Sequence, residues 1–338
     1  METLLEVKNL SVNIRDAEGT VEAVRDVSFF LREGEVMAIV GESGSGKSIL
    51  CKAVMRLLPP SAQIVGGNIL LDGVDITHYR ERDMRKLRGR VFSMVFQDPS
   101  TSLNPTMSIG RQIAEAVEVH EPDLTKKEVD ARVMELMELV GIDHGEVRQK
   151  LYPHNFSGGM RQRCVMAIAL ASHPRILFAD EPTTSLDVTI QAQILDLLVD
   201  IQKKFHTATI FVTHDLGVVA RVADRVAIMY AGKIVEIGTA EEIFYDPRHP
   251  YTWGLLRSLP ILSKGKRELP TIPGSPPSLI NPPAGDAFAC RNPYALAIDY
   301  EEIPPMFQVT DTHYAATWLL APEAKGFRFA EGGVIHGT

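Results

Sequence analysis

The sequence predicts an α/β protein with an antiparallel β subdomain before its core, a helical subdomain inserted into it and a Pro-rich extension after it. Three observations predict this class. Short apolar runs alternate with helical stretches, a glycine-rich loop stands between an apolar run and a helical pattern, and residues from about 99 to 165 have helical periodicity. At 338 residues, one large core with a smaller appendage is the natural organisation.

The first 31 residues contain two strand-like runs, Leu5–Val7 and Val21–Phe30. Turn-prone residues 16–19 separate them. This pattern predicts the small antiparallel sheet.

An apolar run at residues 36–40 leads into Gly-Glu-Ser-Gly-Ser-Gly-Lys-Ser, a complete G-x-x-x-x-G-K-[ST] loop. Glycines let backbone N–H groups close around phosphates, Lys47 places its charge on the β- and γ-oxygens, and the Ser48 hydroxyl can ligate Mg²⁺. A chance Gly/Ser-rich turn is the alternative, but the strand, loop and helix occur in the order that this chemistry needs. The sequence therefore predicts a P-loop NTPase core that binds a nucleoside triphosphate. The predicted contact residues are Gly41, Glu42, Ser43, Gly44, Ser45, Gly46, Lys47, Ser48 and Ile49.

Further along the chain, apolar residues recur at helical spacing in 126–140 and predict a helix there. Apolar runs at 176–179, 209–212 and 226–229 then alternate with helical stretches, as strands of a buried parallel sheet do.

Two acids, Asp180 and Glu181, follow the apolar run at 176–179. Successive strand residues point in different directions, so the two carboxylates can do different jobs. We expect Asp180 to help hold Mg²⁺ and Glu181 to polarise the water that attacks the γ-phosphate. Many strands end in an acid by chance, and the complete phosphate loop upstream favours the catalytic interpretation.

Ser157, Gly158 and Gly159 stand at the start of another helical run. A helix N-terminus with a hydroxyl and unobstructed N–H groups can bind an anion, although a simple Ser N-cap is the alternative. His214 follows the strand-like run 210–213, where a structural histidine would be the ordinary interpretation.

Taken in order, the phosphate loop, Gln97, the Ser-Gly-Gly segment, Asp180-Glu181, Ser185-Leu186-Asp187 and His214 resemble the ATP-binding subunit of an ABC transporter. The resemblance covers about residues 4–245. Segments 152–154, 156–163, 187–194 and 249–252 resemble the D-type subunit of the oligopeptide/dipeptide importer branch.

This resemblance implies a head-to-tail heterodimer with a second, OppF-like ATP-binding subunit, with ATP between the phosphate loop of one subunit and the Ser-Gly-Gly motif of the other. Ser157, Gly158 and Gly159 would contact the γ-phosphate held by the opposite chain. Asp187 would communicate across the interface, and Gln97 would sense Mg²⁺ and connect the site to the membrane subunit. His214 would act with Glu181 in catalysis by orienting the attacking water. The Mg²⁺ residues would be Ser48, Gln97 and Asp180.

The resemblance also implies the setting. The chain would be a peripheral ATPase on the cytoplasmic face of the cell membrane, working with two integral-membrane permease subunits and an extracytoplasmic peptide-binding protein to import oligopeptides or dipeptides. Nickel or an oligosaccharide is an alternative cargo, because the ATPase need not touch the cargo. A soluble ABC ATPase of DNA repair or ribosomes is a different class of alternative, but no long coiled coil, second cassette or basic surface is visible. A GTPase or kinase lacks the Ser-Gly-Gly motif.

Composition narrows the partners. A net charge of −8 argues against nucleic acid. The start lacks a signal-like pattern, and no run approaches the 18 or so apolar residues of a membrane span. Cys51, Cys164 and Cys290 are widely spaced, which fits reduced thiols, and we expect the first two to be core residues.

We predict two domains, a nucleotide-binding domain at 1–245 and an extension at 246–338. Many members of the family that this chain resembles look as though they hold an iron–sulfur cluster in this extension, on four cysteines. The matching positions here hold Asp286, Asn292, Asp299 and Thr317. One remaining thiol, Cys290, cannot replace four thiolates, so we predict no iron–sulfur cluster.

The chain also differs from the common pattern of this family at two places in the nucleotide site. Phe156 and Met160 flank the Ser-Gly-Gly motif where the family commonly has Leu and Gln. An aromatic residue that usually stacks on adenine corresponds to Ile14, so we expect adenine to meet aliphatic surface such as Ile14 and Val21.

Overall fold

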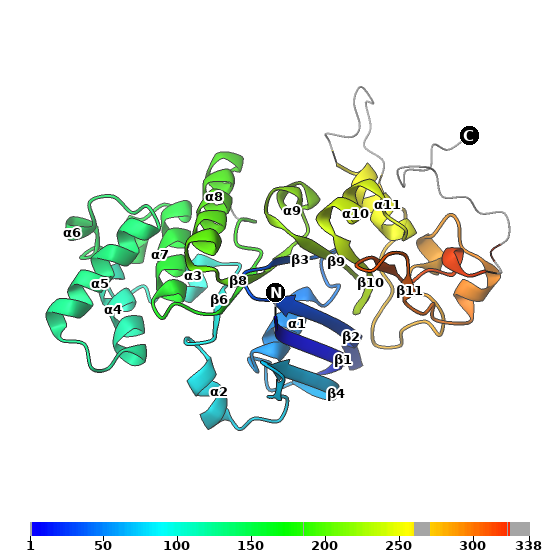
Figure 1. Cartoon of the computed structure of the whole chain (residues 1–338), viewed down its shortest axis with the longest axis horizontal. Coiled ribbons are helices and arrows are strands. Elements are labelled where there is room, and N and C mark those ends of the chain that lie inside the picture. The colour runs from blue at the N-terminus through cyan, green and yellow to red at the C-terminus, as the bar shows by residue number, and fades with distance from the viewer. Residues whose placement is uncertain (1, 185, 260–270, 323, 325–338) are drawn as a thin grey trace. The chain divides into compact units, whose positions relative to one another are not determined.

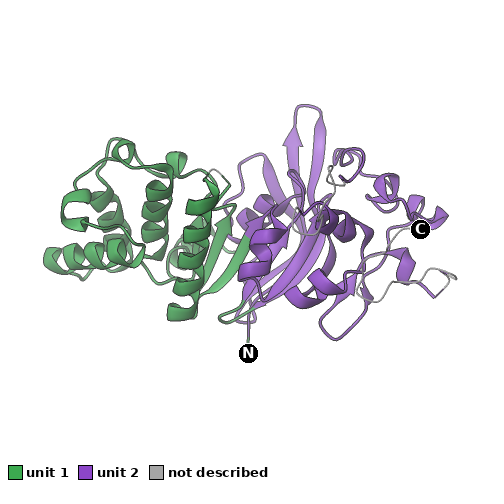
Figure 2. Ribbon diagram, turned by 90° about the horizontal axis from the view of Figure 1, so that it is seen from above, with its two compact units in different colours: residues 1–2, 32–35, 78–211 green, residues 3–31, 36–77, 212–338 purple. Residues whose placement is uncertain are grey.

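A computed structural model describes residues 2–184, 186–259, 271–322 and 324. It divides into two compact units (Figure 2). Unit 1 comprises residues 1–2, 32–35 and 78–211, and unit 2 comprises residues 3–31, 36–77 and 212–338. The division of the chain at residue 245 remains a prediction.

The first sheet of unit 2 is the predicted antiparallel subdomain. It consists of β1 (Thr3–Asp16), β2 (Gly19–Arg32), β4 (Ala62–Leu71) and β5 (Val74–Asp75), in the order β2-β1-β4-β5. β1 pairs antiparallel with β4, and its buried residues include Leu5 and Val7. The expected strands and the turn between them are therefore confirmed.

The second sheet of unit 2 carries the phosphate loop. Its order is β11-β12-β10-β9-β3, where the strands are β3 (Val36–Val40), β9 (Arg225–Tyr230), β10 (Lys233–Thr239), β11 (Phe307–Gln308) and β12 (Tyr314–Ala315). β3 is parallel to β9, while β10 pairs antiparallel with both β9 and β12. Two short strands of the C-terminal extension thus continue the sheet that contains the nucleotide-binding strand.

Short helices surround this sheet. They are α1 (Lys47–Val54), α9 (Leu216–Val222), α10 (Ala240–Tyr245) and α11 (Pro250–Arg257), with single 3₁₀ turns η2 (Ala289–Arg291), η3 (Ala297–Tyr300) and η4 (Trp318–Leu320). One buried cluster joins Val40 of β3, Val226 of β9, Tyr251 of α11 and Phe288 of the extension. The extension and the nucleotide-binding strand therefore share a hydrophobic core.

Unit 1 contains the helical subdomain and the strand that ends in the two acids (Figure 1). Its strands follow the order β8-β7-β6, with β6 (Phe92–Val95) parallel to β7 (Ile176–Asp180); β8 is Ala208–Thr213, of which 208–211 belong to this unit. Its helices are α2 (Glu81–Leu87), α3 (Pro99–Ser102), α4 (Ile109–His120), α5 (Lys126–Leu139), α6 (Gly145–Arg148), η1 (Pro153–Asn155), α7 (Gly158–Leu170) and α8 (Val188–Phe205).

The helix predicted over 126–140 is α5. It begins with a capping box in which Thr125 and Glu128 satisfy each other's backbone N–H groups. Val129, Val133 and Leu136 are buried on one face, and α5 packs against α4 and α7. Within the described part of the chain, none of the helices combines the length and hydropathy that a membrane-spanning helix needs.

Candidate functional site

The phosphate loop lies between β3 and α1 in unit 2, and its glycines are required by the backbone. A Cβ atom on Gly41 would lie 2.0 Å from the carbonyl oxygen of Met229. Gly46 has φ of 100°, and its Cβ would lie 2.2 Å from the carbonyl oxygen of Ala23. At Gly46 the positive φ and the close approach together exclude a residue with a Cβ, and at Gly41 the close approach alone excludes it.

Lys47 is the first residue of α1 and is buried, with 4% of its surface exposed. Its Nζ donates to the carbonyl oxygens of Gly41 and Glu42, each at 2.8 Å. The ammonium group is therefore held inside the loop by the first two loop residues. Ser48 and Ile49 follow in the first turn of α1, and the N-terminus of a helix favours an anion.

The carboxylate of Glu181 is held by two side chains of unit 1. Gln97 Nε2 donates to Glu181 Oε2 at 3.0 Å, and Thr184 Oγ1 donates to the same oxygen at 2.9 Å. The structure therefore brings together two residues that lie 84 positions apart and that the sequence selected separately. Thr184 was missed, because a threonine three residues beyond an acid carries no signal by itself.

Asp180 and Glu181 differ in burial and in backbone conformation. Asp180 is the last residue of β7 and is 5% exposed. Glu181 leaves the strand with φ of 46°, in the left-handed region. This change of backbone direction separates the two carboxylates.

The Ser-Gly-Gly motif starts α7. Ser157 is the N-cap, and its Oγ accepts from the backbone N–H of Met160 at 3.4 Å, as in the simpler interpretation of the motif. Ser157 and Gly158 are exposed. A cap does not exclude an anion site here, because both Ser157 and Gly158 are exposed.

Asp187 is connected to this motif through Ile190. Asp187 is the N-cap of α8, and its Oδ1 accepts from the N–H of Ile190 at 3.0 Å. A Cβ on Gly159 would lie 2.4 Å from Cγ2 of the same isoleucine. The glycine therefore allows the start of α7 to approach the start of α8 closely.

The remaining predicted residues are placed as follows. His214 directly follows β8 and is exposed, and it belongs to unit 2 with the phosphate loop. Ser185 lies outside the described residues. Ile14 in β1 and Val21 in β2 are both partly exposed, and their contact with adenine stays a prediction.

Four residues of this chain stand where family members have the cysteines of the predicted cluster. All four are buried and make local hydrogen bonds. Each side-chain oxygen accepts from a nearby backbone N–H: Asp286 from Phe288, Asn292 from Tyr294, Asp299 from Leu296, and Thr317 from Leu319. The bonds of Asp286, Asn292 and Thr317 are Asx and Ser/Thr turns, and Asp299 caps the start of η3, so all four organise the chain without metal. Hard oxygen donors engaged in this way do not fit an iron–sulfur cluster, which takes thiolates.

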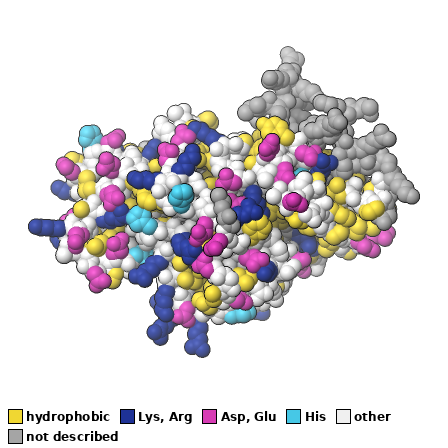
Figure 3. Space-filling view, viewed as in Figure 1, with side chains coloured by type: hydrophobic (Ala, Val, Ile, Leu, Met, Phe, Trp, Pro, Cys, Tyr) yellow, Lys and Arg dark blue, Asp and Glu magenta, His cyan; other side chains and the backbone are white. Residues whose placement is uncertain are grey.

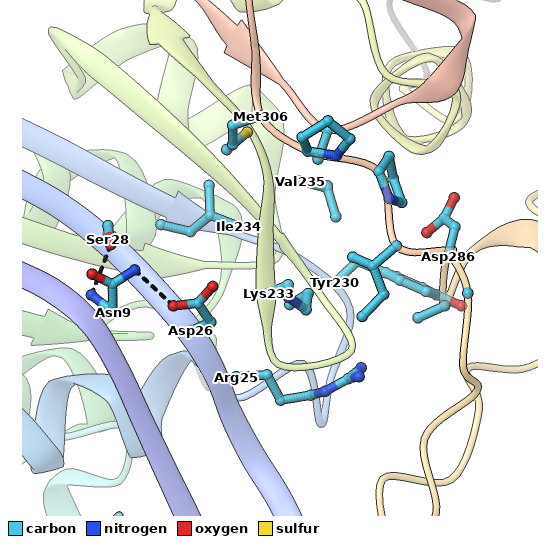
Figure 4. Close-up of a pocket in the computed structure, with 16 residues that line it drawn as sticks. Asn9, Arg25, Asp26, Ser28, Tyr230, Lys233, Ile234, Val235, Asp286 and Met306 are labelled. Carbon is cyan, nitrogen blue, oxygen red and sulfur yellow. Dashed lines mark hydrogen bonds between the residues drawn. The ribbon is translucent and has the colours of Figure 1, made fainter. Parts of the chain in front are cut away.

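A pocket of about 570 Å³ lies beside this part of the extension, within unit 2 (Figure 4). Residues of β2, β9, β10 and the extension line it. They include Arg25, Asp26, Tyr230, Lys233, Asp286 and Met306. Burial raises the pKa of Asp286 to about 6, and the nearby Asp299 carboxyl adds to the shift. Burial lowers the pKa of Lys233, and the Arg25 charge acts in the same direction.

Comparisons with known proteins agree with these motifs. The family model described as "ABC transporter" matches residues 24–184, and the model "Oligopeptide/dipeptide transporter, C-terminal region" matches residues 235–298. The oligopeptide transport ATP-binding protein OppD of Bacillus subtilis is 58% identical over 323 residues, which cover 95% of this chain and 90% of OppD. The dipeptide transport ATP-binding protein DppD of Lactococcus lactis is 55% identical, with 96% and 93% covered.

Solved structures show the same fold. The dimeric structure of an ATP-binding cassette in a post-hydrolysis state, bound to ADP and Pi, matches with a TM-score of 0.63 and 25% identity, covering 70% of this chain and 98% of the cassette. The protein cbiO1 of Clostridium perfringens, part of an ABC transporter complex, matches with a TM-score of 0.62 and 30% identity, covering 72% and 91%.

Proposed function

This chain belongs to the ATP-binding subunits of ABC transporters, in the oligopeptide and dipeptide transport family, and from that premise we propose the role of each residue in its site. The chain is an ATPase that powers peptide import, and its family implies dimeric cassettes and membrane permease partners. The observation that carries our proposal for its chemistry is the fixed carboxylate of Glu181.

Glu181 is the general base in this proposal. Two hydrogen bonds to one carboxylate oxygen hold the side chain in place, while the second oxygen accepts the proton of the attacking water. Thr184, which donates to Glu181 Oε2, would be a positioning residue. His214 orients the water.

The phosphate loop fits Mg²⁺ and ATP. Gly41 and Gly46 occupy positions where a Cβ would clash, and Lys47 supplies a positive charge in the same loop. Ser48, Gln97 and Asp180 would supply hydroxyl, amide and carboxylate oxygens, which are ligands that Mg²⁺ accepts. Bound Mg²⁺ would neutralise charge on the transferring phosphoryl group.

The second half of each ATP site comes from a partner cassette. Ser157 and Gly158 are exposed at the start of α7, and Asp187 is exposed at the start of α8 beside Val188, which is 82% exposed. A dimeric relative bound to ADP and Pi supports this arrangement. We propose that an OppF-like subunit forms a head-to-tail heterodimer with this chain.

The proposal extends to the setting. Two permease subunits would hold the heterodimer at the cytoplasmic face of the membrane, and an extracytoplasmic binding protein would deliver the peptide. Nucleic acid is not a partner. The extension would hold no iron–sulfur cluster, and iron with intense visible absorbance in anaerobically purified protein would contradict this part.

The decisive experiment replaces Glu181 with Gln in the full chain, co-expressed with its partner ATPase and permeases. We expect phosphate release to fall about 100-fold or more, since a positioned general base contributes at least that factor. ATP binding should persist, and closed dimers should accumulate in gel filtration with ATP. Glu135→Gln, an exposed glutamate on α5, serves as the matched control. Normal turnover by Glu181→Gln would rule out the assigned role.

A further inference from the structure

We propose that the C-terminal extension positions the phosphate loop, with Arg291 and Tyr251 as the positioning residues. This inference rests on the proposed nucleotide-binding role of the loop. It concerns residues of unit 2 alone. Glu42 is the second residue of the loop. Residues of the extension contact both its side chain and its backbone.

The side chain of Glu42 is paired with Arg291 of η2. The guanidinium makes two parallel bonds to the carboxylate, Nη1 to Oε2 at 2.7 Å and Nη2 to Oε1 at 3.0 Å. Arg291 is 7% exposed, and its Nε donates to the carbonyl oxygen of Pro273 at 2.8 Å. Such a bidentate pair fixes both direction and distance, which a lysine ammonium cannot do.

The backbone of Glu42 is held by Tyr251 of α11. The hydroxyl of this fully buried tyrosine accepts from the Glu42 N–H at 2.9 Å. Its ring packs against Tyr230 and Phe288, with centroids 4.6 Å and 5.4 Å away. Since Tyr230 also contacts Arg291 through its hydroxyl, at 3.2 Å, the two positioning residues share one buried support.

This arrangement gives a structural role to the segment His249-Pro250-Tyr251-Thr252, which in the sequence indicates only a family resemblance. His249 is the N-cap of α11, and its Nδ1 accepts from the N–H of Tyr251 at 3.1 Å. Pro250 occupies the first helical position, where no N–H is needed. The segment therefore starts a helix whose second residue reaches the phosphate loop.

The contacts reach the nucleotide through Lys47. Its Nζ donates to the carbonyl oxygens of Gly41 and Glu42, so the position of this dipeptide determines where the ammonium lies. Loosening Glu42 would move an acceptor of the lysine that binds phosphate. We therefore expect the extension to control affinity for ATP more than the rate of the chemical step.

The test uses Arg291→Lys and Tyr251→Phe in the full chain, because both keep the bulk of the side chain. Mant-ATP with Mg²⁺ is titrated by fluorescence, and amide hydrogen exchange is followed in residues 41–48. We expect the Kd to rise about tenfold in each variant, because tenfold corresponds to about 1.4 kcal/mol, the size of one lost hydrogen bond. The kcat at saturating ATP should change little, and exchange should accelerate in the loop.

Arg88→Lys is the matched control, because Arg88 makes a similar bidentate pair with Glu81 in unit 1. Unchanged Kd and exchange in both test variants, with normal binding by wild type and Arg88→Lys, would overturn this inference alone. Exchange that accelerates throughout unit 2 would also overturn it, since that result indicates a general packing role. Absence of mant-ATP binding by wild type would instead refute the proposed function.

Discussion

Glu181 has a φ of 46°, a conformation that a residue with a Cβ adopts at a cost of about 1–3 kcal/mol. The hydrogen bonds from Gln97 and Thr184 stabilise this conformation. The carboxylate is thereby directed away from the path of β7, while Asp180 remains buried in it. The φ of Glu181 thus separates the carboxylates of two neighbouring acids.

Asp286 gives a prediction at the same scale. Burial raises its pKa from the ordinary value of 3.8 to about 6, so the folded protein binds this proton more tightly than the unfolded chain does. The favourable contribution of Asp286 is fully present below pH 4 and is lost as the pH rises through 6. Above that pH, the buried carboxylate costs roughly 2–3 kcal/mol of stability.

Asp286→Asn should therefore stabilise the protein at pH 7.5 by an amount of this order, and the difference should vanish near pH 4. The amide keeps an oxygen that can accept from Phe288. Chemical denaturation at several pH values measures the effect. Asp311→Asn, on an exposed residue of the extension, is the control. A constant difference at all pH values would contradict the assignment.

At the scale of elements, α10 connects the end of β10 to the extension. Thr239 and Glu242 form a capping box at its start. The Glu242 carboxylate also accepts hydrogen bonds from Thr310 and Thr312, in the turn between β11 and β12. One side chain therefore caps a helix and holds two strands of the extension on the sheet.

Glu242→Gln tests this connection. Burial opposes ionisation, but hydrogen bonds from Thr310, Thr239 and Thr312 outweigh it and lower the pKa of Glu242 to about 2. This contribution is present above pH 4.5 and is lost as the pH falls through 2. We expect the variant to lose about 1 kcal/mol at pH 7, as for loss of a cap, and the difference from wild type to shrink in acid.

Thermal unfolding between pH 2 and pH 7 measures this difference. The neighbouring Glu241→Gln is a suitable control, because Glu241 is exposed and is not the residue at the capping-box position. Equal losses for both variants would mean that general charge, rather than the cap and the threonine bonds, explains the effect.

At the scale of the whole molecule, surface charge agrees with a protein partner. The chain has a net charge of −8, and Figure 3 shows acidic and basic side chains interspersed over the visible face of α4, α5 and α6. A surface that binds a polyanion would gather Lys and Arg in one patch. The visible face of these helices has no such patch.

The corresponding prediction concerns assembly. The tagged chain, purified from detergent-solubilised membranes of its native cell, should carry with it two permeases, a second ATPase and a peptide-type binding protein, identified by mass spectrometry. The same tag on an unrelated cytoplasmic protein controls for carry-over. Recovery mainly in soluble fractions with ribosomes or DNA-repair proteins would contradict the assembly.

Much of the fold could be predicted, because the phosphate loop and the apolar strands depend on local patterns. The strand 176–180, the helix 126–139 and the antiparallel subdomain follow from periodicity and turn residues. The pairing of β12 with β10 could not be predicted, since a two-residue strand has no periodicity. Thr184 could not be predicted either, because a single threonine carries no signal until its hydrogen bond to Glu181 is seen.

The class of chemistry follows from one short segment of the sequence. Phosphate binding needs glycines, a lysine and a hydroxyl at fixed spacing in one continuous segment, and residues 41–48 supply all of them. The distant residues that support this segment are known only from the folded structure. Arg291 lies 249 positions from Glu42, yet the two are paired, because folding places η2 of the extension beside the loop. Local chemistry is written along the chain, whereas a contact across such a separation depends on the packing of the whole unit.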